Sequence, residues 1–428
     1  MTAAAPADAP ARRGLFFHRD FRRLWIGDAI SQVGTQVSLL ALPLVAVKTL
    51  HASAFEVGAL TACETAAFLL VGLPAGAWCD RVRRRPVLIL GDVGRALALG
   101  SVPLAALLHG LTIGQLFAVA LVTGVLTVFF DVAYQSYLPE LVSREELVDG
   151  NGKLEATRAT SQVVGPSLGG FLVQAFTAPY AVLADAVSYL WSASWVTAIR
   201  AREPAPVPPP QRHLGKEIGE GLRFVLGNPI LRKIAGCTGT ANLFGAANTA
   251  VLVVFLVRTV HLSAGGIGLL FSVGSVGGLL GALTSGMFAK RVGQARAIWL
   301  GALLFAPFNL LEPMTHHDWR LSLAAITLFF GSAGAVIYNV AQVSFRQALC
   351  PRPLLGRMNA TMRFLVWGTM PLGGLLGGWL ATAFGLRNAL WICAVGAQFA
   401  PLWVLFSPLR GLRDVPLPEG EVTPAVAD

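Results

Sequence analysis

At residues 76–86 the sequence reads Gly-Ala-Trp-Cys-Asp-Arg-Val-Arg-Arg-Arg-Pro, and this charged stretch separates two apolar runs. The runs cover residues 55–78 and 87–108, and each is long enough to cross a bilayer as a helix, which takes about 20 residues. One acid and four arginines within six residues cannot lie in hydrocarbon, so the stretch predicts a tight turn at a membrane face. Its positive charge indicates the cytoplasmic face.

The composition is that of a polytopic membrane protein. Of 428 residues, 54% are hydrophobic and only 13% are charged, whereas a soluble domain carries about 25% charged residues. The net charge of +10 is better explained by basic loops that orient the helices than by nucleic-acid binding. The five cysteines are scattered without metal-ligand spacing or a disulfide pattern, so we expect no metal and no cofactor.

Twelve apolar spans are predicted from the hydropathy pattern. They cover residues 23–47, 55–78, 87–108, 113–136, 155–176, 180–199, 230–257, 265–290, 297–314, 320–345, 358–384 and 388–407. With both termini in the cytoplasm, the outer loops hold only Lys48, Arg258, Arg320 and Arg387, while most of the 33 Lys and Arg residues lie inside. This asymmetry supports the predicted topology in the plasma (cytoplasmic) membrane.

The two halves of the sequence are weakly related. A degraded copy of the charged stretch recurs at residues 286–296, with Lys290 in place of Asp80. A second pair of similar segments lies at residues 158–170 and 363–375. Parallel copies of a six-helix unit imply a pseudo-two-fold axis along the membrane normal, with a substrate site between the halves.

The predicted fold is therefore all-α, with twelve transmembrane helices in two pseudo-symmetric bundles. A Pro-rich linker that ends in an amphipathic helix joins the bundles and is expected to lie at the membrane surface or against the bundle ends. The predicted parts are a cytoplasmic tail (1–22), a first bundle (23–199), the linker (200–229), a second bundle (230–407) and a second cytoplasmic tail (408–428).

The sequence resembles the major facilitator superfamily over nearly its whole length. The stretch 76–85 is similar to the family's motif A loop, and Gly165-Pro166-Ser167-Leu168-Gly169-Gly170 is similar to the G-P-x-x-G-G antiporter motif of its exporters. A longer form of that motif has a glycine where this chain has Ser161. Softer similarity at 21–27, 131–141 and 185–189 indicates the branch of siderophore (enterobactin-type) and macrolide exporters.

This resemblance implies two functional motifs. Motif A would form a cytoplasmic latch in which Asp80 lies near the start of the eleventh helix when the protein faces outward, and Arg84 or Arg85 reaches Asp131. Its residues are Gly76, Asp80, Arg81, Arg84, Arg85 and Asp131. The alternative is a charge cluster that only sets topology. The antiporter motif, formed by Gly165, Pro166, Gly169 and Gly170, would bend the fifth helix and pack it tightly between the halves.

Acids within the spans are candidates for proton coupling. A charged Asp at the bilayer centre costs ~2.5–3.5 kcal/mol, so each acid must face the bundle interior or a cavity. Glu64 lies deep in its span without a basic neighbour in sequence, and it is the first candidate; Asp28 is the second. The alternative for both is a carboxyl group hydrogen-bonded to a neighbouring helix. Asp92 and Asp185 are expected to have structural roles.

Polar residues inside apolar runs should also avoid lipid. They are candidates to line the substrate cavity or, equally, to bond one helix to another: Gln32, Gln36, Tyr134, Asn242, Asn248, Tyr338, Asn339 and Gln342. Gly165–Gly169 fits the G-x-S-x-G pattern of serine hydrolases, but that motif needs a strand-turn-helix, and here it lies inside an apolar helix. We therefore do not expect an enzyme.

The function predicted from sequence is export of an amphipathic or apolar organic compound by proton antiport and alternating access. The chain has no G-x-x-x-x-G-K-[ST] loop, so ATP is not expected to drive it directly. The expected partners are a small molecule, protons and the lipid bilayer, and the expected state is a monomer. An importer of a small nutrient is the alternative with the same fold, and a membrane-embedded enzyme is a remote one.

Overall fold

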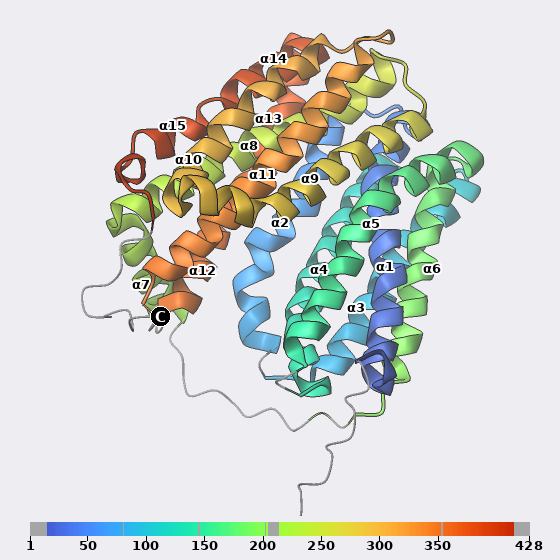
Figure 1. Cartoon of the computed structure of the whole chain (residues 1–428). Coiled ribbons are helices and arrows are strands. Elements are labelled where there is room, and N and C mark those ends of the chain that lie inside the picture. The colour runs from blue at the N-terminus through green and yellow to red at the C-terminus, as the bar shows by residue number, and fades with distance from the viewer. Residues whose placement is uncertain are drawn as a thin grey trace, which may run out of the picture.

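The computed structural model describes residues 15–79, 81–143, 146–201, 203, 214–351 and 354–414. This part of the chain is helical and holds no strand. Figure 1 shows the first-half helices α1 and α3–α6 on one side and the second-half helices on the other, with α2 between them. The all-α prediction is confirmed.

The first half contains six long helices. They are α1 (Arg19–Leu44, continued by the π-turn η2, Val45–Thr49), α2 (Ala54–Cys79), α3 (Arg84–Leu107), α4 (Ile113–Leu141), α5 (Leu147–Phe176) and α6 (Ala178–Thr197). A short 3-10 turn, η1 (Leu15–Phe17), precedes them. Helix α1 packs on α5 and α6, and α3 packs on α4 and α6.

The second half repeats this arrangement with more broken helices. Its elements are α8 (Pro229–Arg258), α9 (Ala264–Val292), α10 (Gln294–Phe305) with η3 (Ala306–Met314), α11 (Leu321–Leu349), α12 (Leu355–Trp367) with α13 (Thr369–Phe384), α14 (Leu386–Ala397), α15 (Ala400–Leu405) and η5 (Pro408–Gly411). Helix α10 gives way to the 3-10 segment η3 where Pro307 lacks the backbone donor that the α pattern needs.

The linker prediction falls partly outside the described residues. Its Pro-rich part, 204–210, lies there, but the amphipathic part forms α7 (Leu214–Gly227). Helix α7 packs against α12, where Glu220 forms an ion pair with Arg357. We call the end of the molecule that holds α7 and the start of α1 the linker end, and the opposite end the far end (Figure 1).

Ten segments of the described chain are long and apolar enough to cross a membrane. Helices α5 and α6 are not among them, although they match the predicted spans 155–176 and 180–199. Helix α5 begins earlier than predicted, with a polar segment that contains Lys153, Glu155 and Arg158. Its 30 residues still run beside α1 and α9 as one continuous helix.

The halves meet mainly through two helix pairs, α5 with α9 and α2 with α13, and α2 also contacts α8 and α12. A Cβ atom on Gly268 would lie 2.2 Å from the carbonyl oxygen of Pro166, and one on Gly170 would lie 2.4 Å from that of Ala264. In the other pair, a Cβ atom on Gly58 would lie 2.4 Å from the carbonyl oxygen of Gly374. Both contacts are therefore backbone against backbone and require glycine.

These contacts lie toward the far end of the molecule. Gly58 is in the second turn of α2, which starts at that end, and Gly170 is two turns before the end of α5. The hydroxyl groups of Ser167 and Ser272 add a hydrogen bond of 2.7 Å, and Arg258 donates one of 2.6 Å to the carbonyl of Ala52. These short backbone contacts and hydrogen bonds therefore join the two halves at the far end of the molecule.

We predict that Gly58→Ala lowers the thermal unfolding temperature of the purified protein. The added methyl group meets the Gly374 backbone, which no rotamer change relieves, so overpacking should cost about 1–3 kcal/mol. The matched control is Gly72→Ala on the same helix, where a Cβ atom has nothing within 4 Å. Equal unfolding temperatures for the two variants would contradict this description of the interface.

Candidate functional site

A cavity of about 540 Å³ lies between the two halves. Its size is that of a small-molecule site. Walls come from α1, α2 and α5 of the first half and from α8, α9 and α11 of the second. The side chains that bring polar groups to it are Gln36, Thr61, Glu64, Glu155, Arg158, Gln162, Thr249, Ser275 and Ser332.

Glu64 brings an unpaired carboxyl group to this cavity. Its Oε1 atom is buried and has no hydrogen-bond partner. Helix α4 passes close behind it, since a Cβ atom on Gly124 would lie 2.8 Å from the Glu64 carbonyl oxygen. A carboxylate held there without a compensating donor is costly, so this group is suited to exchanging a proton with the cavity.

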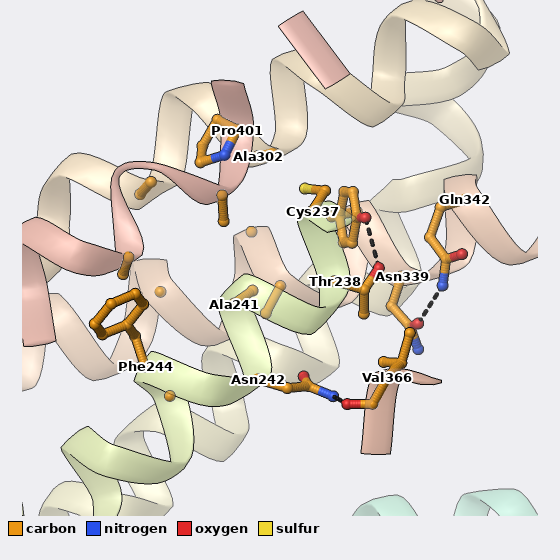
Figure 2. Close-up of a pocket in the computed structure, with 18 of the residues that line it drawn as sticks. Cys237, Thr238, Ala241, Asn242, Phe244, Ala302, Asn339, Gln342, Val366 and Pro401 are labelled. Carbon is orange, nitrogen blue, oxygen red and sulfur yellow. Dashed lines mark hydrogen bonds between the residues drawn. The ribbon is translucent and has the colours of Figure 1, made fainter. Parts of the chain in front are cut away.

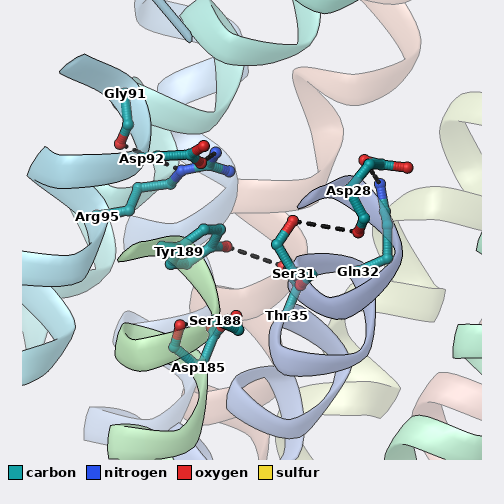
Figure 3. Close-up of polar contacts among 10 residues, drawn as sticks. All are labelled: Asp28, Ser31, Gln32, Thr35, Gly91, Asp92, Arg95, Asp185, Ser188 and Tyr189. Carbon is teal, nitrogen blue, oxygen red and sulfur yellow. Dashed lines mark hydrogen bonds and ion pairs between the residues drawn. The ribbon is translucent and has the colours of Figure 1, made fainter. Parts of the chain in front are cut away.

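Asp28 has a different environment. Its side chain is buried inside the first half, where Gln32 Nε2 donates a hydrogen bond of 3.2 Å to Oδ1 (Figure 3). The hydroxyl of Tyr134 is buried and has no hydrogen-bond partner in the described chain. None of Asp28, Gln32 and Tyr134 lines the cavity between the halves. Asp28 and Gln32 instead bond to each other inside the first half.

Asp92 and Arg95 form a buried ion pair at 2.6 Å. The guanidinium group lies between two rings, 4.2 Å from the centre of Phe130 and 4.1 Å from that of Tyr189. Figure 3 shows that the Tyr189 hydroxyl bonds to Thr35, at 2.9 Å, so the cluster connects α1, α3 and α6. The Oδ2 atom of Asp92 is buried without a hydrogen-bond partner, but the ion pair with Arg95 gives the carboxyl group a fixed counter-charge, as a structural role requires.

Asp185 is likewise buried, and its Oδ1 accepts a hydrogen bond of 3.0 Å from Ser188. A Cβ atom on Gly34 would lie 2.6 Å from that oxygen. The acid therefore sits where α1 and α6 are closest, and it belongs to the packing of the first half.

The motif A arginines contact the first half. Arg84 Nη1 lies 3.2 Å from Glu140 and 3.6 Å from Glu203, and Arg85 Nε donates a hydrogen bond of 3.3 Å to the carbonyl of Val196. They fix the start of α3 to the ends of α4 and α6.

No ion pair of Arg84 or Arg85 with Asp131 is found in the described part of the chain, where Arg84 pairs with Glu140 and Glu203 instead. The latch is expected in the outward-facing state, so its contact with Asp131 stays a prediction. Asp131 lies nine residues before Glu140 on α4, about 13 Å deeper along the helix.

The remaining motif A residues are less informative. Gly76 lies in the last turn of α2, and Arg81 is exposed. Asp80 lies outside the described residues, so its predicted position near the eleventh helix is not tested.

The antiporter motif serves two packing contacts. Pro166 and Gly170 face α9, as described above, while Gly165 and Gly169 face α1. A Cβ atom on Gly165 would lie 2.3 Å from Gln36 Cβ, so α5 contacts α1 and α9 at the same level. Ser167 bonds to Ser272 inside this interface, which leaves the G-x-S-x-G pattern without a catalytic arrangement.

A second cavity, of about 610 Å³, lies within the second half (Figure 2). All five second-half candidates line it: Asn242, Asn248, Tyr338, Asn339 and Gln342. They also bond to each other and to neighbouring helices. Gln342 donates to Asn339 at 2.9 Å and Asn242 donates to the Val366 carbonyl at 3.0 Å, as Figure 2 shows. The same side chains therefore both line the cavity and bond to other polar groups, so the two expected roles are not exclusive.

Glu312 is a buried acid that the sequence reasoning missed. It lies in η3, is 3% exposed, and both its carboxyl oxygens accept from Asn248 Nδ2, at 3.1 and 3.2 Å. A usable signal existed, because an ionisable residue stands within the predicted span 297–314 beside Pro313. Among the described residues, no group of three or more His, Cys, Asp or Glu side chains is placed to hold a metal ion.

Comparison with known proteins relates the chain to exporters. It is 28% identical to the multidrug efflux pump Tap of Mycolicibacterium fortuitum over 83% of this chain and 87% of Tap. It is 29% identical to the enterobactin exporter EntS of Escherichia coli O1:K1 / APEC over 80% of each chain. These relatives are transporters and not enzymes.

Solved structures share the fold at low sequence identity. A bacterial homologue of iron transporter ferroportin in its inward-facing state superposes with a TM-score of 0.74 over 91% of this chain and 98% of that one, at 16% identity. In the outward-facing state the TM-score is 0.59, over 90% and 98% of the two chains, also at 16% identity.

The family model described as transmembrane secretion effector matches residues 11–419, which is nearly the whole chain. The protein is therefore a multi-pass membrane transporter that belongs to the transmembrane secretion effector family of the major facilitator superfamily.

Proposed function

We propose that this transporter exports an amphipathic or apolar organic compound from the cytoplasm in exchange for protons. One observation carries the proposal: Glu64, with a buried carboxyl oxygen that has no partner, lines the cavity between the halves. A group that both faces the cavity and lacks a fixed counter-charge can bind a proton in one state and release it in another. The names of the relatives, a multidrug efflux pump and an enterobactin exporter, support the direction of transport.

The proposed mechanism is competition between proton and substrate. Protonation of Glu64 favours one orientation of the halves and bound substrate favours the other, so by linkage each lowers the affinity of the other. Asp28 is the second acid of the proposal. Its hydrogen bond from Gln32 gives the carboxyl group a fixed partner, which makes it the weaker candidate.

The proposed conformation is inward-facing, with the linker end and both termini in the cytoplasm. The close glycine contacts and the Ser167–Ser272 bond toward the far end support this, since they join the halves on the side away from the linker. The better superposition on an inward-facing structure agrees with it. Transport then requires these far-end contacts to open while the linker end closes, and we propose that motif A acts in that closure.

We predict that Glu64→Gln abolishes substrate-driven proton movement. Inside-out vesicles would be energised by respiration, and an internal pH dye would report dissipation of the gradient when amphipathic compounds are added. The amide keeps the size of the side chain but cannot carry the proton. The rate of dissipation should therefore fall at least about tenfold, which corresponds to an activation free energy higher by about 1.4 kcal/mol or more. Asp149→Asn, an exposed acid in the first turn of α5, is the matched control.

Two outcomes would change this assignment. Full activity of Glu64→Gln together with loss in Asp28→Asn would move the coupling site to Asp28 and keep antiport. No response of the folded wild-type protein to a broad panel, combined with uptake in right-side-out vesicles, would favour the importer alternative.

We also predict that the double variant Ser167→Cys/Ser272→Cys can be locked. The two hydroxyl oxygens lie 2.7 Å apart, so the replacing thiols fall within reach of a disulfide bond. Oxidation should cross-link α5 to α9 and stop transport, and reduction should restore it, because the far end can no longer open. Each single variant serves as a control for oxidation of the five free native cysteines. Undiminished transport by the cross-linked protein would show that the halves do not separate there.

A further inference from the structure

The second-half cavity carries positive charge without negative charge. Arg346, one turn before the end of α11, and Arg363, in α12, both line it. No aspartate or glutamate is among the described residues of its wall. Both arginines lie toward the linker end of their membrane spans, and the Nε atom of Arg346 is buried there.

Neither arginine has a carboxylate partner in the described chain. Arg346 Nε is buried and lacks a hydrogen-bond acceptor. The guanidinium group of Arg363 lies 5.1 Å from the centre of the Trp367 ring, a cation–π contact that leaves its N–H groups available. By contrast, Arg95 pairs with Asp92 and Arg158 pairs with Glu155. The two cavity arginines are therefore placed to receive an anion that this part of the chain does not supply.

The buried acid Glu312 is separated from the cavity by Asn248. Asn248 lines the wall, and its Nδ2 donates to both carboxyl oxygens of Glu312 behind it. The cavity thus meets an amide at this position rather than a carboxylate. Glu312 consequently does not neutralise Arg346 or Arg363, and no ion pair between them is found among the described residues.

The rest of the wall suits a flat apolar body. The rings of Phe244, Tyr338 and Trp367 face the same cavity. On α11, Asn339, Gln342 and Arg346 are spaced by three and four residues, so they form one face of the helix with Arg346 nearest the linker end. A ligand of about 10 Å can then place its charge at the arginines and its body among the rings.

We propose that this cavity binds organic anions, aromatic or apolar compounds with a carboxylate or a similar anionic group, and that Arg346 and Arg363 are their charge partners. The inference rests on the proposed export function and specifies its substrate class. It assigns the negative charge of the substrate to the second half, whereas the proton site proposed above lies between the halves.

The test is direct binding to the purified protein, measured by equilibrium dialysis in phosphatidylcholine nanodiscs. The probes are 2-naphthoate, its neutral analogue 2-naphthamide and the cation 2-naphthylmethylammonium. We expect 2-naphthoate to bind at least about tenfold more tightly than the other two. Arg346→Gln and Arg363→Gln should each remove about this factor for naphthoate and leave naphthamide binding unchanged, which also shows that the variants are folded. Arg346→Lys should retain part of the preference.

The exposed Arg296 provides the matched control, and Arg296→Gln should bind like wild type. Equal affinities for the three probes, or a preference that survives both substitutions, would overturn the inference. Displacement of naphthoate when phosphatidylglycerol is added to the nanodiscs would also overturn it, since the anion would then be a lipid headgroup. Glu64→Gln should keep the naphthoate preference. If the wild-type protein shows this preference but moves no protons when naphthoate is transported, the proposed antiport fails and this site stands.

Discussion

The structure depends on the close approach of two helix pairs across its middle, α5 with α9 and α2 with α13. In a membrane, lipid tails are as apolar as the side chains, so burial alone does not hold the halves together. At Gly58 and Gly268, carbonyl oxygens of the other half occupy the space that a Cβ atom would fill in any other residue. A joint made of short backbone contacts, rather than of interlocked side chains, can hold the halves and still let them separate.

The buried charges of the chain are handled in three ways, and each way suits a different role. Asp92 and Arg95 neutralise each other between aromatic rings, which makes a rigid core of the first half. Glu312 is bonded to a neutral amide and remains behind the wall of a cavity. Glu64 and Arg346 have buried atoms without partners and also line a cavity. Asp92, Asp185 and Arg84 have such atoms too, but they line neither cavity. Because unpaired buried groups are costly, we regard Glu64 and Arg346 as the positions where the chain is best placed to exchange ions with its surroundings.

The sequence predicts those features that are set by the membrane itself. Apolar length and basic loops identify the helices, and α2 begins and ends within one residue of the predicted span 55–78. The start of α5 was placed at residue 155 instead of Leu147, because its first turns are polar and hydropathy does not detect them. The polar residues Asn242 and Asn248, which were expected to avoid lipid, line the cavity of the second half.

Other features depend on helix rotation and packing, which periodicity does not supply. Gln32 and Gln36 are one turn apart on α1, yet Gln32 bonds to Asp28 inside the bundle while Gln36 faces the cavity between the halves. Glu140 rather than Asp131 receives Arg84, because the turn before α3 meets α4 near its end. The sequence offers both Glu140 and Asp131 as partners for Arg84, and it does not show which of them lies closer.

A side-chain contact between α2 and α12 links the walls of the two cavities. Through this contact the proposed proton site and the proposed substrate site could influence each other. Phe68 lies one helical turn from Glu64 on α2, and its ring meets that of Trp367 edge-on, with centres 4.7 Å apart. Trp367 lines the second cavity and carries the guanidinium group of Arg363 on its face. An anion bound at Arg363 would lie against the same ring that packs one helical turn from Glu64, the proposed proton site. Since α2 and α12 belong to opposite halves, rocking of the halves must change this contact, so the two proposed ligands would both act on it.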